Sequence, residues 1–212
     1  MSRAVIQAAE IVASGEGTKV QSIALKDALD QLQISRVNGD GRCLWHSIVV
    51  SFFLSRRCSE YEVKKLDREG RIVKLAKHLR MRVREELELN ETGRMKDEYA
   101  PFWTCDEEYT GGAKTESEYL DKISSGTLFG GALELLAASK VLNCPFIVFN
   151  AESGDKTAQL SWHGKPSGIF CALPLFRRKL HYDAAKWRNE NGESDCAKAA
   201  GTATRPQAPS AR

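Results

Sequence analysis

The sequence lacks the cysteine spacing of a disulfide-stapled domain or of a zinc module. Its six cysteines are scattered without close pairs and without a Cys-x-x-Cys motif, at positions 43, 58, 105, 144, 171 and 196. With no signal peptide either, this usage favours free thiols in a reducing compartment, so we expect a cytoplasmic protein. Cys43 and His46 have half of a metal-ligand spacing, but no second close pair of Cys or His accompanies them. We therefore expect no metal site.

Long apolar runs and a strong net charge are missing as well. The longest uncharged apolar stretch, around residues 43–54, is too short to cross a bilayer, so no membrane span is expected. The formal net charge of +3 is small and gives no strong case for nucleic acid or an anionic membrane as a partner. A phosphate-cradling loop would need more glycines and a lysine than the segment at 39–41 supplies. What remains is an ordinary composition, 42% hydrophobic and 28% charged, in 212 residues, which suits one soluble domain with a tail.

The order of the predicted elements indicates an α+β domain. Helices are predicted from apolar periodicity, capping boxes and composition, and they cover or begin at residues 22–32, 43–54, 59, 72–87, 115 and 132–142. After Pro145 the pattern changes to short runs of β-forming residues, which predict strands at 146–149, 159–162, 169–173 and 179–183. Helices followed by strands are typical of the α+β class.

Composition also suggests the boundaries of this domain. We expect an N-terminal extension at residues 1–20, one domain at 21–190, and a disordered tail at 191–212, where large apolar residues are absent. Residues 93–114 carry glycines and an aromatic cluster and are expected to form an ordered loop. The helix at 72–87 has a basic face, which we interpret as a solvated face because glutamates follow directly and offset its charge.

Cys43 follows a glycine-bearing turn and opens an apolar run. Gly39 and Gly41 permit positive φ, so the backbone can turn tightly there and aim its amide N–H groups at one point. The apolar run places Cys43 in the first turn of a buried helix, and the positive end of a helix favours the nucleophilic thiolate. The alternative is a small buried hydrophobe, which describes most free cysteines. A redox-sensing thiol is less favoured because no resolving cysteine is adjacent.

Among the four histidines, His181 is the best candidate for a base that acts on Cys43. His181 and Asp183 lie two residues apart in a predicted strand, so their side chains share a face and the carboxylate can accept a bond from one ring nitrogen. The other nitrogen is then available for the proton of the Cys43 thiol. The remaining histidines are expected to pack locally, to lie exposed on a helix, or to end a strand (His46, His78 and His163, respectively).

Four stretches, in this order, resemble the ovarian tumour (OTU) family of cysteine deubiquitinases. They are Asp40-Gly41-Arg42-Cys43-Leu44-Trp45-His46-Ser47, Phe129-Gly130-Gly131 with Leu133-Glu134-Leu135, the strand at Pro145 to Phe149, and Leu180-His181-Tyr182-Asp183. They look like the family's Asp-Gly-Asn-Cys-aromatic signature, its aromatic-Gly-x-x-Glu-Leu segment, its central strand and its closing His-Tyr-Asp/Asn motif. The residues after the cysteine look closer to OTU domains of viruses and mobile elements than to most cellular ones.

The resemblance implies an α+β papain-like fold, with a small central β-sheet flanked by helices. It makes Cys43 the nucleophile, His181 the general base and then acid, and Asp183 the residue that orients His181. The backbone amides around Asp40, Gly41 and Cys43 would form the oxyanion hole. Asp40 is therefore expected to be a catalytic residue, together with Cys43, His181 and Asp183. Arg42 stands where the family signature has Asn, a departure expected to alter the shape and charge of the loop.

The implied reaction is thiol-dependent hydrolysis of the isopeptide bond after the C-terminal Gly-Gly of ubiquitin, without a metal or cofactor. The expected partners are ubiquitin or polyubiquitin chains, with ubiquitin-like modifiers as further candidates, and neither nucleic acid nor membrane. We expect a monomer in the cytoplasm, or in the host cytoplasm if the chain is viral. Two alternatives stay open: another cysteine peptidase that uses the Cys43–His181 pair, such as a polyprotein-processing protease, and a ubiquitin-binding module whose Arg42 has spoiled the loop.

Overall fold

The structure of the chain is a computed structural model that describes residues 7–8, 10–11, 21–39, 41–56, 58–88, 96, 99, 111–152, 154–164 and 172–188. The prediction for Asp40 lies outside these residues. So do the predictions for most of the extension at 1–20, for most of the aromatic loop at 93–114, and for the tail at 191–212.

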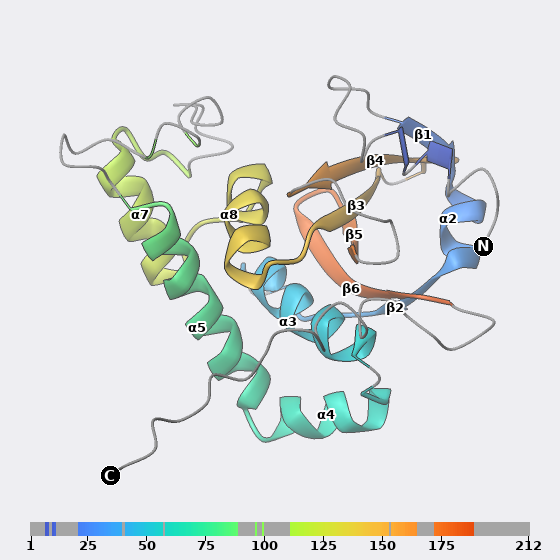
Figure 1. The fold of residues 1–212 in the computed structure, drawn as a ribbon, viewed down its shortest axis with the longest axis horizontal. Coiled ribbons are helices and arrows are strands. Elements are labelled where there is room, and N and C mark those ends of the chain that lie inside the picture. The colour runs from blue at the N-terminus through green and yellow to red at the C-terminus, as the bar shows by residue number, and fades with distance from the viewer. Residues whose placement is uncertain are drawn as a thin grey trace, which may run out of the picture.

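A six-stranded mixed sheet forms the centre of the fold (Figure 1). Its strand order is β1-β4-β3-β5-β6-β2, in which only the central β3–β5 pair is parallel. The strands are β1 (Gln21–Ala24), β2 (Leu32–Ser35), β3 (Phe146–Ala151), β4 (Thr157–His163), β5 (Leu173–Arg178) and β6 (His181–Trp187). The buried apolar run predicted at 146–149 is therefore an inner strand, as expected for a strand covered on both faces.

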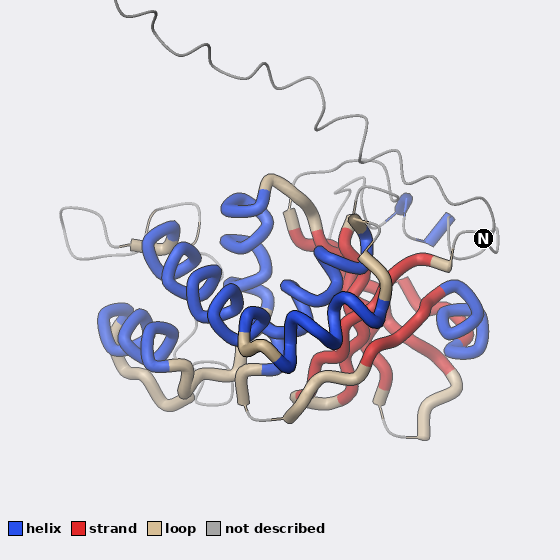
Figure 2. Tube along the Cα trace, turned by 90° about the horizontal axis from the view of Figure 1, so that it is seen from below, coloured by secondary structure: helices blue, strands red, loops and turns tan. Residues whose placement is uncertain are grey.

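Most of the helices gather on one side of the sheet, and α2 lies at the far end from them (Figure 2). The helices are α2 (Leu25–Gln31), α3 (Cys43–Ser55), α4 (Glu60–Arg68), α5 (Arg71–Glu86), α7 (Glu116–Ser125) and α8 (Ala132–Leu142). Helix α3 packs directly on β6 and β5, and α5 packs on α3, α7 and α8. The α+β papain-like prediction is confirmed in this arrangement of helices around one central sheet.

Two apolar cores lie on opposite faces of the sheet, and the alternation of side chains along β3 separates them. Phe146 and Val148 belong to the larger core beneath α3, α5 and α8, whereas Ile147 and Phe149 belong to a smaller core that includes Ala28 of α2. Helix α3 is buried along most of its length, so its polar residues need partners inside the protein.

The helix boundaries confirm several predictions. Helix α3 begins at Cys43, and α8 covers the predicted 132–142. The Ser59 side chain accepts the Glu62 amide in a complete capping box before α4. The Thr115 side chain accepts the Glu118 amide and begins α7. These starts are local features, because a cap needs only the residues of one turn.

Three predictions are wrong in their extent. The helix expected at 22–32 is only α2, because its ends are drawn into the sheet: β1 pairs with β4, and β2 pairs with β6. These pairings override local helix propensity. The strand expected at 169–173 begins only at Leu173 and runs to Arg178, since it is fixed by parallel pairing with β3, and residues 169–171 lie outside the described part. Lys179 has a φ of +54° in the turn that follows, so β6 begins at His181 rather than at 179.

Candidate active site

Cys43 is the first residue of α3, and the turn before it aims it at the sheet. Gly41 has a φ of +80°, a left-handed conformation that glycine adopts without strain. The Arg42 carbonyl accepts the amides of Trp45 at 3.1 Å and His46 at 3.3 Å, which closes the first turn. Cys43 itself is 3% exposed. Its sulfur thus lies at the positive end of a 13-residue helix, where a thiolate is stabilised.

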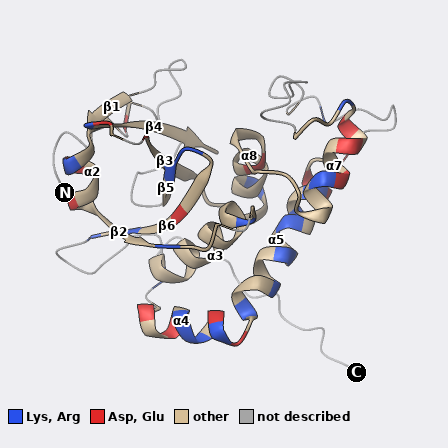
Figure 3. Ribbon diagram, turned by 180° about the vertical axis from the view of Figure 1, so that it is seen from behind, with Lys and Arg blue, Asp and Glu red and all other residues tan. Residues whose placement is uncertain are grey.

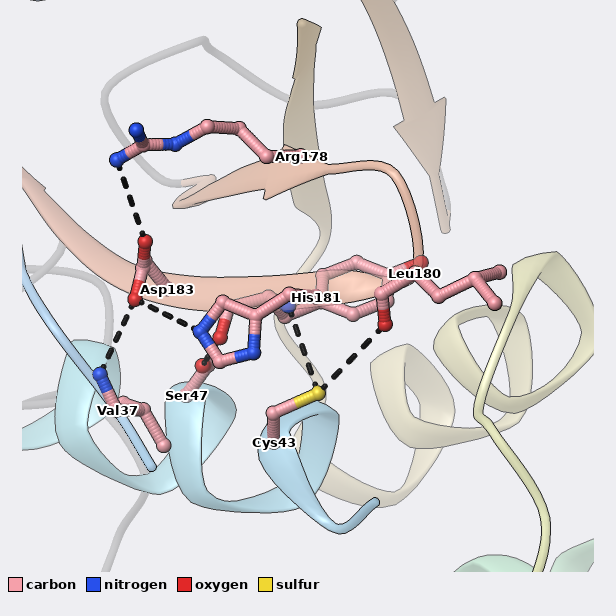
Figure 4. A network of polar contacts seen from close by, with 8 residues as sticks. Val37, Cys43, Ser47, Arg178, Leu180, His181 and Asp183 are labelled. Carbon is pink, nitrogen blue, oxygen red and sulfur yellow. Dashed lines mark hydrogen bonds and ion pairs between the residues drawn. The ribbon is translucent and has the colours of Figure 1, made fainter. Parts of the chain in front are cut away.

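The Cys43 sulfur contacts the backbone at the start of β6 (Figure 4). The Tyr182 amide donates to Sγ at 3.4 Å, and the Leu180 carbonyl lies 3.8 Å from Sγ as an acceptor for the thiol. An amide donor stabilises the thiolate form, and a carbonyl acceptor suits the thiol form. Both protonation states of Cys43 therefore have a backbone partner next to His181.

His181 and Asp183 form the hydrogen bond that the His-x-Asp pattern predicts. His181 Nε2 and Asp183 Oδ1 are 3.1 Å apart, the Asp183 side chain is 5% exposed, and the His181 side chain is 33% exposed. With Nε2 on the carboxylate, the other ring nitrogen is Nδ1. Figure 4 shows this nitrogen on the side of the ring that faces the Cys43 sulfur. The three side chains thus lie in the order that a thiol, a base and an orienting carboxylate require.

The Asp183 carboxylate also fixes the chain segment that leads to Cys43. The Val37 amide donates to Asp183 Oδ1 at 3.1 Å, and Arg178 Nη2 lies 3.6 Å from Oδ2. The Arg178 side chain is 50% exposed, so this ion pair is worth little in free energy. The part-buried hydrogen bond from the Val37 amide connects the β2–α3 loop to β6, so one carboxylate positions both His181 and the loop before Cys43.

Two serines on α3 hold β5 and β6 in register with Cys43. Ser47 Oγ donates to the Tyr182 carbonyl at 2.9 Å. Ser51 Oγ donates to the Pro174 carbonyl at 3.2 Å and accepts the Ala185 amide at 2.9 Å. Cys43, Ser47 and Ser51 are spaced by four residues and therefore lie on one helix face. This spacing of polar residues inside an apolar helix was the sequence signal for these two contacts, which the sequence analysis missed.

Gly39 differs from the expectation of positive φ, because Gly41 is the glycine of this loop that adopts it. Gly39 lies beside His181, and a Cβ there would lie 3.4 Å from His181 Nδ1, an ordinary van der Waals distance. Gly130 is the tighter position, because a Cβ there would overlap Leu44 Cδ2. Of these two glycines, Gly130 is therefore the one that close packing explains.

Glu134, in the predicted segment before the central strand, is a buried acid at the start of α8. It is 1% exposed, accepts the Gly131 amide at 2.7 Å, and is hydrogen-bonded to the Tyr119 hydroxyl. Burial raises the pKa of the Glu134 carboxyl above its usual value, although both hydrogen bonds oppose that rise. This pair joins α7 to α8 and has a structural role.

The other histidines lie on other elements. His46 lines cavities beside α3, His78 is exposed on α5, and His163 is on β4, where it is 3.1 Å from Ser161 Oγ. Burial, followed by the positive charge of Arg177, lowers the pKa of His163 to about 4, so this imidazole is neutral at physiological pH. Of the histidines, His181 is the one that the fold brings to Cys43.

Two further features concern the described part of the chain alone. It contains no group of three or more His, Cys, Asp or Glu residues that could hold a metal ion, and no disulfide joins any two of Cys43, Cys58 and Cys144. None of the helices within it has the length and apolar character needed to cross a membrane. Cys105, Cys171 and Cys196 lie outside the described residues.

The sequence and the fold were compared with those of known proteins. A comparison with curated protein sequences finds no match. The fold is similar to the Hazara virus OTU bound to ubiquitin, with 18% identity, 81% of this chain and 89% of that chain covered, and a TM-score of 0.52. The viral OTU domain protease from Taggert virus has 18% identity, coverage of 82% and 89%, and a TM-score of 0.53. The structure described as h/ceOTUB1-ubiquitin aldehyde-UBCH5B~Ub has 13% identity, coverage of 87% and 98%, and a TM-score of 0.53.

The family model described as OTU-like cysteine protease matches residues 38–182. This match covers more than half of the chain, and it includes both Cys43 and His181. The sequence match and the fold agree, and the chain belongs to the family of OTU-like cysteine proteases.

Proposed function

We propose that the protein is a deubiquitinase that hydrolyses the isopeptide bond after the C-terminal Gly-Gly of ubiquitin. The observation that carries the proposal is the convergence of Cys43, His181 and Asp183 at the start of α3, within an OTU fold. Similar OTU domains have been solved bound to ubiquitin, which supports ubiquitin as the substrate. Ubiquitin-like modifiers are further candidate substrates, and we propose that the protein acts as a monomer in the cytoplasm.

The chemistry follows from the positions of three groups. His181 takes the thiol proton, and the Cys43 sulfur attacks the carbonyl carbon of the terminal glycine. His181 then gives the proton to the leaving lysine amine, which leaves a thioester on Cys43. In the second half, His181 removes a proton from water, the hydroxide attacks the thioester carbonyl, and the thiol is restored. Asp183 keeps His181 in the tautomer and orientation that both halves need.

The oxyanion of each tetrahedral intermediate needs backbone donors at the loop before α3. The amides of Gly41 and Cys43 lie at this helix start, and the amide of Asp40, outside the described residues, belongs to the same loop. Such donors contribute about 3–4 kcal/mol each in other acyl-transfer sites. Arg42, in place of the family's Asn, is exposed in this loop and adds a positive charge beside the site.

A ubiquitin with a thiol-reactive group at its C-terminus tests the proposal directly. We expect a covalent adduct with the wild-type protein and none with Cys43→Ala. Cys58→Ala is the matched control, because Cys58 is also a free thiol and is half-buried. Its adduct should equal that of the wild type.

Other outcomes favour the two alternatives. Tight but non-covalent binding of this probe would point to a ubiquitin-binding module, in which Arg42 prevents catalysis. Neither adduct nor binding, together with cleavage of an unrelated peptide that depends on Cys43, would point to another cysteine peptidase. Either result would overturn the deubiquitinase assignment.

A further inference from the structure

A basic cavity of about 300 Å³ lies between α3, α5 and α7, next to the loop that carries Cys43. Its polar lining consists of basic and hydroxyl side chains, namely Arg42, His46, Lys77, Arg80, Ser124 and Ser125. No carboxylate lines it among the described residues. Figure 3 shows Lys and Arg distributed along α5, the helix that supplies two of these cations. The cavity has room for a tetrahedral oxyanion together with several waters of about 30 Å³ each.

Arg80 is the buried cation of this cavity. It is 6% exposed, and its Nε is buried without a hydrogen-bond partner in the described part of the chain. None of the ion pairs between described residues includes Arg80 or Lys77. Burying an arginine normally requires a carboxylate or equivalent hydrogen bonds, because an uncompensated buried charge is costly. Within the described part of the chain, the Arg80 guanidinium therefore has no carboxylate that compensates its charge.

The fold makes specific room for this guanidinium at the end of α7. Gly126 is the C-cap of α7 with a φ of +76°, and a Cβ there would overlap Arg80 Nη1 and lie 2.8 Å from Cζ. Glycine is favoured at this cap by its left-handed conformation alone. The contact with Arg80 adds a second reason, because another residue would push the guanidinium out of its place.

The charges around the cavity repel one another. Burial, followed by the positive charge of Arg42, lowers the pKa of Arg80, yet a guanidinium stays protonated at neutral pH. The carbonyl end of α7 beside Gly126 offsets part of this charge, as a helix C-terminus carries about half a negative charge. The carbonyl end of α7 lies on one side of the guanidinium, so the side toward the cavity can bind a ligand.

We propose that this cavity binds a tetrahedral oxyanion of the phosphate class. A guanidinium offers several N–H donors in a planar fork that matches phosphate oxygens, and Lys77 adds a point charge at the rim. Ser124 and Ser125 make the wall at the end of α7 polar, although their hydroxyls donate to the Leu120 and Lys122 carbonyls in this structure. The anion is supplied either as free phosphate or as the phosphoryl group of a phosphorylated peptide. A bound anion would lie against Arg42, the residue directly before Cys43.

Titration of the full chain with inorganic phosphate tests the site without any reference to catalysis. Ionic strength is held constant with sodium chloride, binding is followed by calorimetry, and the thermal midpoint is measured in parallel. We expect saturable binding to the wild type. Lys77→Ala should weaken it by about tenfold or more, the effect of losing one charge-assisted hydrogen bond. Arg80→Met should abolish it.

Lys74→Ala is the matched control, because it removes the same charge from an exposed position on α5 that does not line the cavity. It should leave the affinity for phosphate unchanged. Lys77→Ala decides the matter if Arg80→Met fails to fold. A second arm compares a short phosphoserine peptide with its unphosphorylated form. Tighter binding of the phosphopeptide than of free phosphate identifies the peptide-borne group as the source.

The proposal is overturned if neither phosphate nor the phosphopeptide binds the wild type beyond the effect of chloride. It is equally overturned if Lys74→Ala weakens binding as much as Lys77→Ala, because the attraction is then only the general charge of α5. Failure of either kind would leave the reaction of Cys43 with ubiquitin untouched.

Discussion

On the side of α3 that faces β5 and β6, Cys43, Ser47 and Ser51 each contact backbone groups of the strands. On the side that faces α5 and α7, the buried Arg80 has an Nε without a hydrogen-bond partner and no ion pair within the described part of the chain. Both regions bury polar groups beside one helix. On the strand side, the fold itself supplies the hydrogen-bond partners, and these fix the positions of the groups around Cys43. On the helix side, the Arg80 guanidinium can still gain free energy by binding the oxyanion that we propose as its ligand.

For the side of α3 that faces β5 and β6, the largest effect is expected from substitution of Asp183. Asp183→Ala removes the acceptor of both His181 and the Val37 amide, so we expect kcat/KM on a ubiquitin substrate to fall by about 100-fold, the equivalent of one charge-assisted hydrogen bond. Asp183→Asn keeps an oxygen at this position and should recover most of the activity. A loss confined to KM in the alanine variant would contradict an orienting role for Asp183.

Low pH should reduce the stability of the fold through His163, which lies on β4 and on neither of the two compared sides of α3. The pKa of His163 is lowered to about 4 in the folded state, from an ordinary value of 6.5, by burial and Arg177. Its contribution is intact above pH 6.5 and is lost as the pH falls toward 4, since the unfolded state takes up the proton first. We expect the free energy of unfolding to fall by roughly 2–3 kcal/mol over this range.

Urea unfolding at pH 7 and at pH 4.5 measures this effect, with His163→Gln as the comparison. The variant should show a smaller loss between the two pH values than the wild type. An equal loss in both proteins would assign the acid sensitivity to other groups.

Substitution of Ser47 and Ser51 distinguishes an effect on the stability of the fold from an effect on the position of His181. Ser47→Ala and Ser51→Ala should each reduce the free energy of unfolding by about 1–2 kcal/mol, because a buried backbone group loses its partner. Ser47 bonds Tyr182, next to the base, so its loss should also reduce activity more than the loss of Ser51 does. Urea unfolding and kcat/KM on the same preparations give both values, and equal activities would remove the positioning role of Ser47.

The smallest effect on stability is expected on the side of α3 that faces α5 and α7, at Arg80. Arg80→Met replaces a buried charge by an apolar side chain of similar length, so stability in phosphate-free chloride buffer should change by less than about 1 kcal/mol, or should rise. A loss of 3 kcal/mol or more would mean that Arg80 is already compensated within the fold, for example by the carbonyl end of α7. The comparison drawn between the two sides of α3 would then fail.

Local signals predicted much of the fold. The caps at Ser59 and Thr115, the start of α3 at Cys43 and the inner strand β3 depend on residues within one element. The helix predicted at 22–32 failed because β1 and β2 are defined by partners more than a hundred residues away. Periodicity in a single segment contains no information on such pairing.

The site shows the same division. The His181–Asp183 hydrogen bond follows from strand geometry and was predicted, and the turn at Gly41 was predicted from glycine chemistry. The Val37 amide on Asp183 and the contact of Gly39 with His181 join elements that only the folded sheet brings together. The cation Arg80 was read as part of a solvated basic face, but packing of α5 against α7 buries it. Helix periodicity does not distinguish those two outcomes.

The Tyr182 amide that bonds the Cys43 sulfur is 139 residues downstream of it. During synthesis, Cys43 therefore leaves the ribosome long before His181 does. A nascent chain that has formed α3 but not β6 has a thiol without a proton acceptor and a helix face with unpaired serines. Since contacts of such sequence separation form late, we expect the protease to become active only when β6 docks, and any chain truncated before β6 should be inert toward ubiquitin even if its helices fold.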